Sequence, residues 1–79
     1  MTIFQKVQSE GISLKALTPD ELYQLCKERG LTNVCCDIVR YRLLDELSNK
    51  EIYTMLGYSR SRYFGIKKRI KTDPVFYEI

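Results

Sequence analysis

The apolar residues of this chain recur mostly at three- and four-residue steps, which is the spacing of helices that bury one face. The clearest helix start is Thr18-Pro19-Asp20-Glu21, which combines a capping residue, a proline at the first helical position and a glutamate at the third. Gly30 supplies a stop, because glycine readily takes the left-handed conformation that ends a helix. The pattern therefore predicts a helix over about 19–29.

The rest of the N-terminal half also carries helix signals. Residues 2–10 place apolar side chains on one face, and Gly11 ends this short predicted helix. Residues 12–17 alternate between apolar and polar side chains, which leaves an extended segment open there. Thr32-Asn33 can cap a further helix over about 33–46, whose apolar positions recur at helical spacing.

Two short helices joined by a tight turn are predicted over residues 48–71. Ser48-Asn49-Lys50-Glu51 is a second capping box and opens a helix over about 49–56. Ser59 caps the last helix, over about 60–71. Gly57 lies between the two helices. It can end the first helix abruptly, because it readily takes the left-handed conformation that other residues resist. This arrangement is typical of a helix-turn-helix.

The predicted core of this unit comes from one side of each helix. At about 100° per residue, Tyr63, Ile66 and Ile70 share one face of the last helix. The residues expected to pack against them are Ile52, Leu56 and Tyr58, and the helix over about 49–56 is also expected to bury Met55. The apolar residues 75–79 are expected to pack back onto the fold or to meet a partner.

The predicted fold class is all-α, a small bundle of four to five helices in a single domain, 1–79. Within it we expect N-terminal helices over 1–47, a helix-turn-helix over 48–71 and a C-terminal tail over 72–79. A chain of 79 residues is short for a folded domain. Such a chain buries only about 60% of its unfolded surface, so its stability is expected to be marginal.

The distribution of charge indicates a function. The net charge is +3, yet residues 1–47 carry six basic and seven acidic side chains. Residues 58–71 carry six basic side chains and no acidic one. Such a helix forms no internal ion pairs and repels itself unless an anion compensates. Positive charge concentrated in this way indicates a polyanionic partner.

The exposed face of the last helix is therefore the candidate DNA-binding surface. The first residues of a recognition helix usually reach base edges, which is the place of Arg60 and Ser61. Phe64 would either meet thymine methyl groups or pack under residues 75–79. The residues expected at phosphates are Lys67, Lys68, Arg69 and Lys71. The full set of candidate DNA-binding residues is Ser59, Arg60, Ser61, Arg62, Phe64, Lys67, Lys68, Arg69 and Lys71.

These residues resemble a known group. The region-4-type helix-turn-helix of sigma factors looks similar to Leu47-Ser48-Asn49-Lys50-Glu51-Ile52, Leu56-Gly57-Tyr58-Ser59-Arg60-Ser61, Tyr63-Phe64 and Lys67-Lys68-Arg69. The likeness is greatest to phage late-gene transcription activators of the ArpU/RinA type, and it covers about residues 38–71. The resemblance implies that the second helix reads promoter DNA, with Ser59, Arg60, Ser61, Phe64 and Lys68 at the DNA. Two residues depart from the pattern: Tyr53 stands where a small residue is common, and Gly65 lies in mid-helix.

The sequence therefore predicts a DNA-binding transcriptional regulator, encoded by a phage or mobile element and acting on double-stranded DNA. Residues 1–47 would supply contacts for a homodimer, for RNA polymerase or for another regulator protein. Two alternatives stay open. One is a protein-binding modulator or inhibitor of another regulator, and the other is an accessory protein of DNA packaging or recombination.

Other classes of function lack support in the sequence. The chain has no histidine, no glycine-rich phosphate loop and no paired nucleophile and base, so we expect no enzyme and no cofactor. Cys26, Cys35 and Cys36 lack the paired spacing of zinc ligands and are expected to be partly buried thiols, with no metal site. Residues 1–11 lack the features of a secretory signal, and no apolar run would cross a bilayer. We therefore expect a cytoplasmic location and no membrane contact.

Overall fold

Five α-helices and two short 3₁₀ turns make up the computed structural model, which describes all of residues 1–79 and contains no strand. This confirms the all-α fold class. The helices are α1 (Ile3–Glu10), α2 (Pro19–Glu28), α3 (Asn33–Leu43), α4 (Asn49–Leu56) and α5 (Arg60–Ile70). The 3₁₀ turns are Leu14–Ala16 and Pro74–Phe76.

Local capping chemistry explains where most of these helices begin and end. The side chains of Thr18 and Glu21 form a reciprocal capping box at the start of α2, and α4 opens with the same arrangement. Gly11 and Gly57 end α1 and α4 in the left-handed conformation, with φ of 63° and 73°. The predicted helices near 2–10, 19–29, 49–56 and 60–71 are therefore confirmed.

Two predictions about local structure are wrong. Residues 12–17 form no continuous extended segment, because Ser13 caps a 3₁₀ turn over Leu14–Ala16 that buries Leu14. The helix predicted over about 33–46 ends at Leu43. Glu46 takes a left-handed conformation with φ of 55°, and the chain turns there toward α4. The apolar spacing continues past the turn, which is why the sequence pattern placed the end too late.

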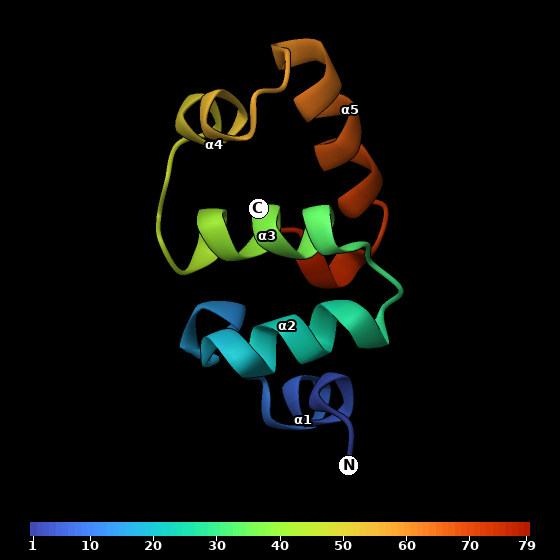
Figure 1. The fold of residues 1–79 in the computed structure, drawn as a ribbon. Coiled ribbons are helices and arrows are strands. Elements are labelled where there is room, and N and C mark those ends of the chain that lie inside the picture. The colour runs from blue at the N-terminus through green and yellow to red at the C-terminus, as the bar shows by residue number, and fades with distance from the viewer.

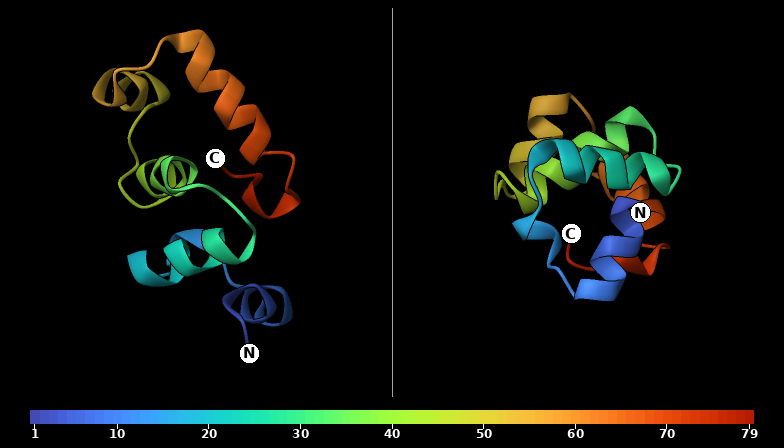
Figure 2. Two further views of the ribbon diagram at one scale, coloured as in Figure 1. Left: turned by 45° about the vertical axis from the view of Figure 1, so that its right-hand side comes forward. Right: turned by 90° about the horizontal axis from the view of Figure 1, so that it is seen from below.

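The helices are stacked along the long axis of a molecule measuring 38 × 21 × 18 Å. Figure 1 shows α1 at one end, α2 and α3 in the middle, and α4 and α5 at the other end. The left view of Figure 2 shows the same order. All fully buried side chains are hydrophobic, and they form one continuous cluster. The helix-turn-helix therefore shares its core with the N-terminal helices.

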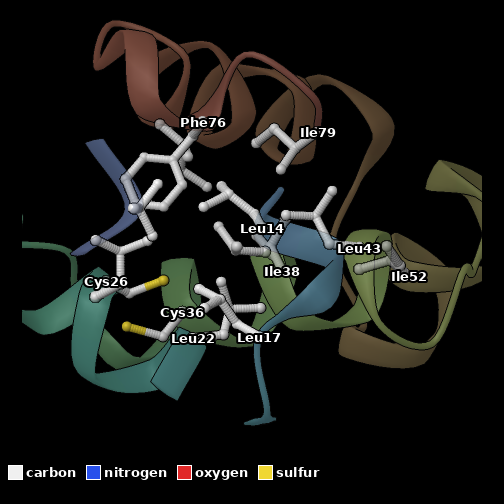
Figure 3. Packing of buried hydrophobic residues seen from close by; sticks show 14 of the residues in the cluster. Leu14, Leu17, Leu22, Cys26, Cys36, Ile38, Leu43, Ile52, Phe76 and Ile79 are labelled. Carbon is white, nitrogen blue, oxygen red and sulfur yellow. The ribbon is translucent and has the colours of Figure 1, made fainter. Parts of the chain in front are cut away.

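The C-terminal tail completes this core. Phe76 and Ile79 are buried, and Figure 3 shows them near Leu14 and Leu43. The prediction that the tail packs back onto the fold is confirmed. The tail is also held by a polar contact, since Arg29 Nε donates to Asp73 Oδ2 at 2.7 Å.

The three cysteines are free thiols. Cys26 and Cys36 are buried in the core and Cys35 is half-buried, close to what the sequence predicts. Burial raises the pKa of Cys26 strongly and that of Cys36 as well, so both are protonated at neutral pH.

Removing the ring of Phe76 should destabilise the whole domain. We expect Phe76→Ala to lower the free energy of unfolding by about 3–5 kcal/mol, because a fully buried phenylalanine leaves a cavity. Tyr77 is 69% exposed, so Tyr77→Ala should change the free energy of unfolding by no more than about 0.5 kcal/mol. Urea unfolding of both variants measures the difference. Equal, small effects would mean that the tail is not part of the core.

Acidification should weaken the attachment of the tail through Asp73. Burial alone would raise the pKa of this carboxyl, but hydrogen bonds from Arg29 and from the Val75 N–H outweigh burial and hold the pKa below its usual value. A pKa lowered in the folded state adds stability above about pH 4, and this stability is lost as the pH falls through the folded value.

The measurement is the melting temperature of the wild type and of Asp73→Asn between neutral pH and about pH 2. The advantage of the wild type over the variant should shrink steadily below about pH 4. A constant difference across the range would show that this carboxylate is not the group responsible.

Candidate nucleic-acid interface

The turn between α4 and α5 is short and well defined. Gly57 ends α4, and the Tyr58 N–H donates to the Tyr53 carbonyl at 2.9 Å. Ser59 then caps α5 by accepting a hydrogen bond from the Arg62 N–H at 3.2 Å. Two consecutive caps of this kind fix the angle at which α5 leaves α4.

A buried hydroxyl anchors α5 to α4. Tyr63 is fully buried, and its Oη donates to Asn49 Oδ1 at 2.8 Å. Lys67 Nζ donates to the same oxygen at 3.2 Å. Burial raises the pKa of Tyr63 and lowers the pKa of Lys67, and the nearby Arg42 also lowers the pKa of Lys67. Asn49 therefore joins the two helices from the first turn of α4.

Arg42 supports this unit from α3. Its Nη1 donates to the Leu47 carbonyl at 2.7 Å, just before α4 begins. Its Nε donates to the Ile79 main-chain oxygen at 3.1 Å. One guanidinium group thus holds both the start of the helix-turn-helix and the end of the tail. Neither Arg42 nor Asn49 was a predicted site residue, because both act through partners that are close only in the folded chain.

The apolar side of α5 faces the core nearly as predicted. Tyr63 and Ile70 are buried and Ile66 is half-buried. On α4, Ile52 is buried and Leu56 is half-buried, but the prediction that Met55 is buried is wrong. Met55 is 53% exposed, because its place about 60° round the helix from Ile52 lies on the side away from Leu56.

Tyr53 and Tyr58 both pack at this junction. Tyr53 is half-buried with its ring centroid 5.7 Å from that of Tyr63. It lies beside the second helix without preventing its docking. Tyr58 is half-buried in the turn, with the Arg62 guanidinium 4.4 Å from its ring centroid. Both are aromatic packing residues of the motif.

The opposite side of α5 brings nearly all the predicted site residues onto one surface, which we call the basic face. The exposed members are Ser59, Arg60, Ser61, Arg62, Phe64, Lys68, Arg69 and Lys71. Lys67 is the exception, since it is half-buried and bound to Asn49. No cation of the basic face forms an ion pair within the chain, whose three ion pairs all lie elsewhere.

Phe64 lies at the edge of the basic face. Phe64 is 37% exposed. Its ring packs edge-on against the ring of Tyr63, with the two ring centroids 5.2 Å apart. The Arg60 guanidinium and Lys67 Nζ lie 5.7 and 5.8 Å from its ring centroid. The expectation that Phe64 packs under residues 75–79 is not what the structure shows, because the tail buries Phe76 and Ile79 in the main core. Phe64 remains available at the surface.

Other surface features carry less chemistry. A hollow of about 560 Å³ lies between α1 and the tail, with Phe4, Arg29 and Asp73 among its lining residues. The two charged groups, Arg29 and Asp73, are already paired with each other. The chain has no group of three or more Cys, Asp or Glu side chains placed to hold a metal ion. None of its helices is both long enough and apolar enough to span a bilayer.

Replacing Asn49 should lower the free energy of unfolding more than replacing an exposed residue of α4. Asn49→Ala leaves the buried Tyr63 hydroxyl without a partner, which we expect to cost about 1–3 kcal/mol of unfolding free energy. Adding Tyr63→Phe should recover part of this loss, because no hydroxyl is then stranded. Thr54→Ala, at an exposed position of α4, is the control and should change stability by about 0.5 kcal/mol or less. Strictly additive effects of the two substitutions in urea unfolding would show that the pair is not coupled.

The chain was also compared with known proteins. No protein-family model, no curated protein and no solved structure matches it. The resemblance to sigma-factor region 4 and to ArpU/RinA-type activators therefore stays a prediction from the motif.

Proposed function

We propose that this protein is a DNA-binding transcriptional regulator that reads duplex DNA with the basic face of α5. The observation that carries the proposal is the set of unpaired cations that project from a helix docked by its other side. These cations are Arg60, Arg62, Lys68, Arg69 and Lys71. Phosphates along a duplex are the regularly spaced anions that such a set would bind.

The dimensions of α5 suit a major groove. Eleven residues at about 1.5 Å each give a rod of roughly 16 Å, and the groove of B-form DNA is about 12 Å wide. The caps at Gly57 and Ser59 and the Tyr63–Asn49 bond hold this rod at a fixed angle. A preformed rod loses little conformational entropy on binding, which favours affinity.

The positions along α5 support different roles. Arg60 and Ser61 lie in the first turn, the part of a recognition helix that reaches base edges. Lys68, Arg69 and Lys71 lie at the other end, where phosphate contacts fix position without reading sequence. Lys67 is assigned a smaller part in DNA contact, because its ammonium group already binds Asn49.

The likeness to ArpU/RinA-type activators supports a role in transcription and an origin in a phage or mobile element. DNA packaging or recombination would use the same contacts, so those roles rank second. A homodimer and a contact with RNA polymerase stay predictions. The alternative is that α5 binds an acidic protein surface. Measuring DNA binding and protein capture with the same chain distinguishes this alternative from DNA binding.

Binding to duplex DNA should weaken steeply with salt. If the four exposed cations other than Arg60 meet phosphates, the slope of log K against log salt concentration should be about −3 to −4. Fluorescence anisotropy of a labelled duplex, selected by the chain from a random-sequence pool, measures this slope. No binding to any duplex, together with capture of an acidic protein from a nuclease-treated extract, would reject the proposal.

Arg60 and Lys68 should differ in what they contribute. Arg60→Ala should reduce discrimination between selected and random duplexes, because an arginine at a base edge is worth about 1–3 kcal/mol of specificity. Lys68→Ala should weaken binding to every duplex by about tenfold and reduce the salt slope by about one. Lys15→Ala removes an exposed cation outside the helix-turn-helix and should change neither quantity. Identical behaviour of Arg60→Ala and Lys68→Ala would contradict the assigned roles.

A further inference from the structure

Gly65 is a glycine that the fold does not require. The other three glycines have positive φ angles of 63°, 80° and 73°, a conformation that favours glycine. Gly65 lies inside α5 with ordinary helical geometry. Apart from its chain neighbours and the nearby backbone of α5 itself, a methyl group added there would meet no atom of the protein within 4 Å. An alanine would therefore fit, and it would favour the helix.

The position of Gly65 is central to the basic face. Helical spacing places Ser61 one turn before it and Lys68 one turn after it, on the side of α5 opposite Tyr63. Long cationic side chains stand on either side of Gly65, with Lys68 about 60° round the helix on one side and Arg62 about 60° round on the other. Gly65 therefore adds no side chain of its own between these cations.

We propose that Gly65 is a positioning residue at which the backbone of α5 lies directly against the wall of a DNA groove. This inference rests on the proposed function and adds where the closest approach occurs. A glycine that weakens its own helix is explained when a partner comes too close for a side chain. A side chain at residue 65 would hold the helix off the DNA and lengthen the contacts of the flanking cations.

The test compares stability with DNA binding in the same variants. Gly65→Ala should raise the melting temperature by about 4 °C or more, because alanine favours the helix. It should nevertheless weaken binding to the duplex selected by the wild type by about tenfold. Gly65→Leu should weaken it further, because the larger side chain increases the separation. Circular dichroism melts and fluorescence anisotropy provide the two measurements.

Ser9→Ala is the matched control. It introduces a better helix former at an exposed position of α1, at the far end of the molecule, and should leave DNA binding unchanged. A stabilised Gly65→Ala that binds as tightly as wild type, while Lys68→Ala binds more weakly, would overturn the inference and keep the proposed function. A destabilised Gly65→Ala would overturn it too, since the fold would then need the glycine. A wild-type chain that binds no duplex would overturn both.

Discussion

The structure depends on the burial of Tyr63. Its ring lies against Tyr53 of α4, and its hydroxyl donates to Asn49 at 2.8 Å. The ring supplies hydrophobic contact, and the hydrogen bond removes the penalty of a buried hydroxyl without a partner. Because Tyr63 occupies one side of α5, its burial decides which residues of that helix face solvent. The exposure of Ser61 and Lys68 on the opposite side is a geometric consequence.

This exposure has an electrostatic cost that α5 offsets only in part. Lys67, Lys68 and Arg69 lie in its last turn, where the helix dipole favours positive charge. The first turn contains Arg60 and Arg62 with no acidic residue, and there the dipole disfavours cations. The cation–π contacts of these two arginines with Phe64 and Tyr58 relieve little of this, since such contacts are weak at exposed sites. In the proposed complex, a phosphate beside Arg62 would offset the charge of that arginine and the dipole, which leaves Arg60 for the base edges.

Much of this fold could be predicted from the sequence because its helix ends are set by neighbours along the chain. Thr18 with Glu21, Ser48 with Glu51, and Gly57 alone fix three boundaries that the structure reproduces. The role of Asn49 could not be predicted, because it depends on a contact with the distant Tyr63. The end of α3 was placed too late because the apolar spacing runs on past the turn at Glu46. Met55 shows a further limit: helical spacing identifies residues that share a face, but the width of the buried strip depends on how the partner helix lies.

The N-terminal helices therefore act as the platform that orients α5. Arg42 on α3 holds the Leu47 carbonyl ahead of α4 and the Ile79 oxygen at the end of the tail. α3 also contributes Ile38, Val39 and Leu43 to the shared core. The tail that follows α5 returns to this core through Phe76, so α5 is held at both ends. A rod fixed in this way presents its cations in one geometry before any partner arrives, and this preorganisation is what the proposed recognition of DNA would need.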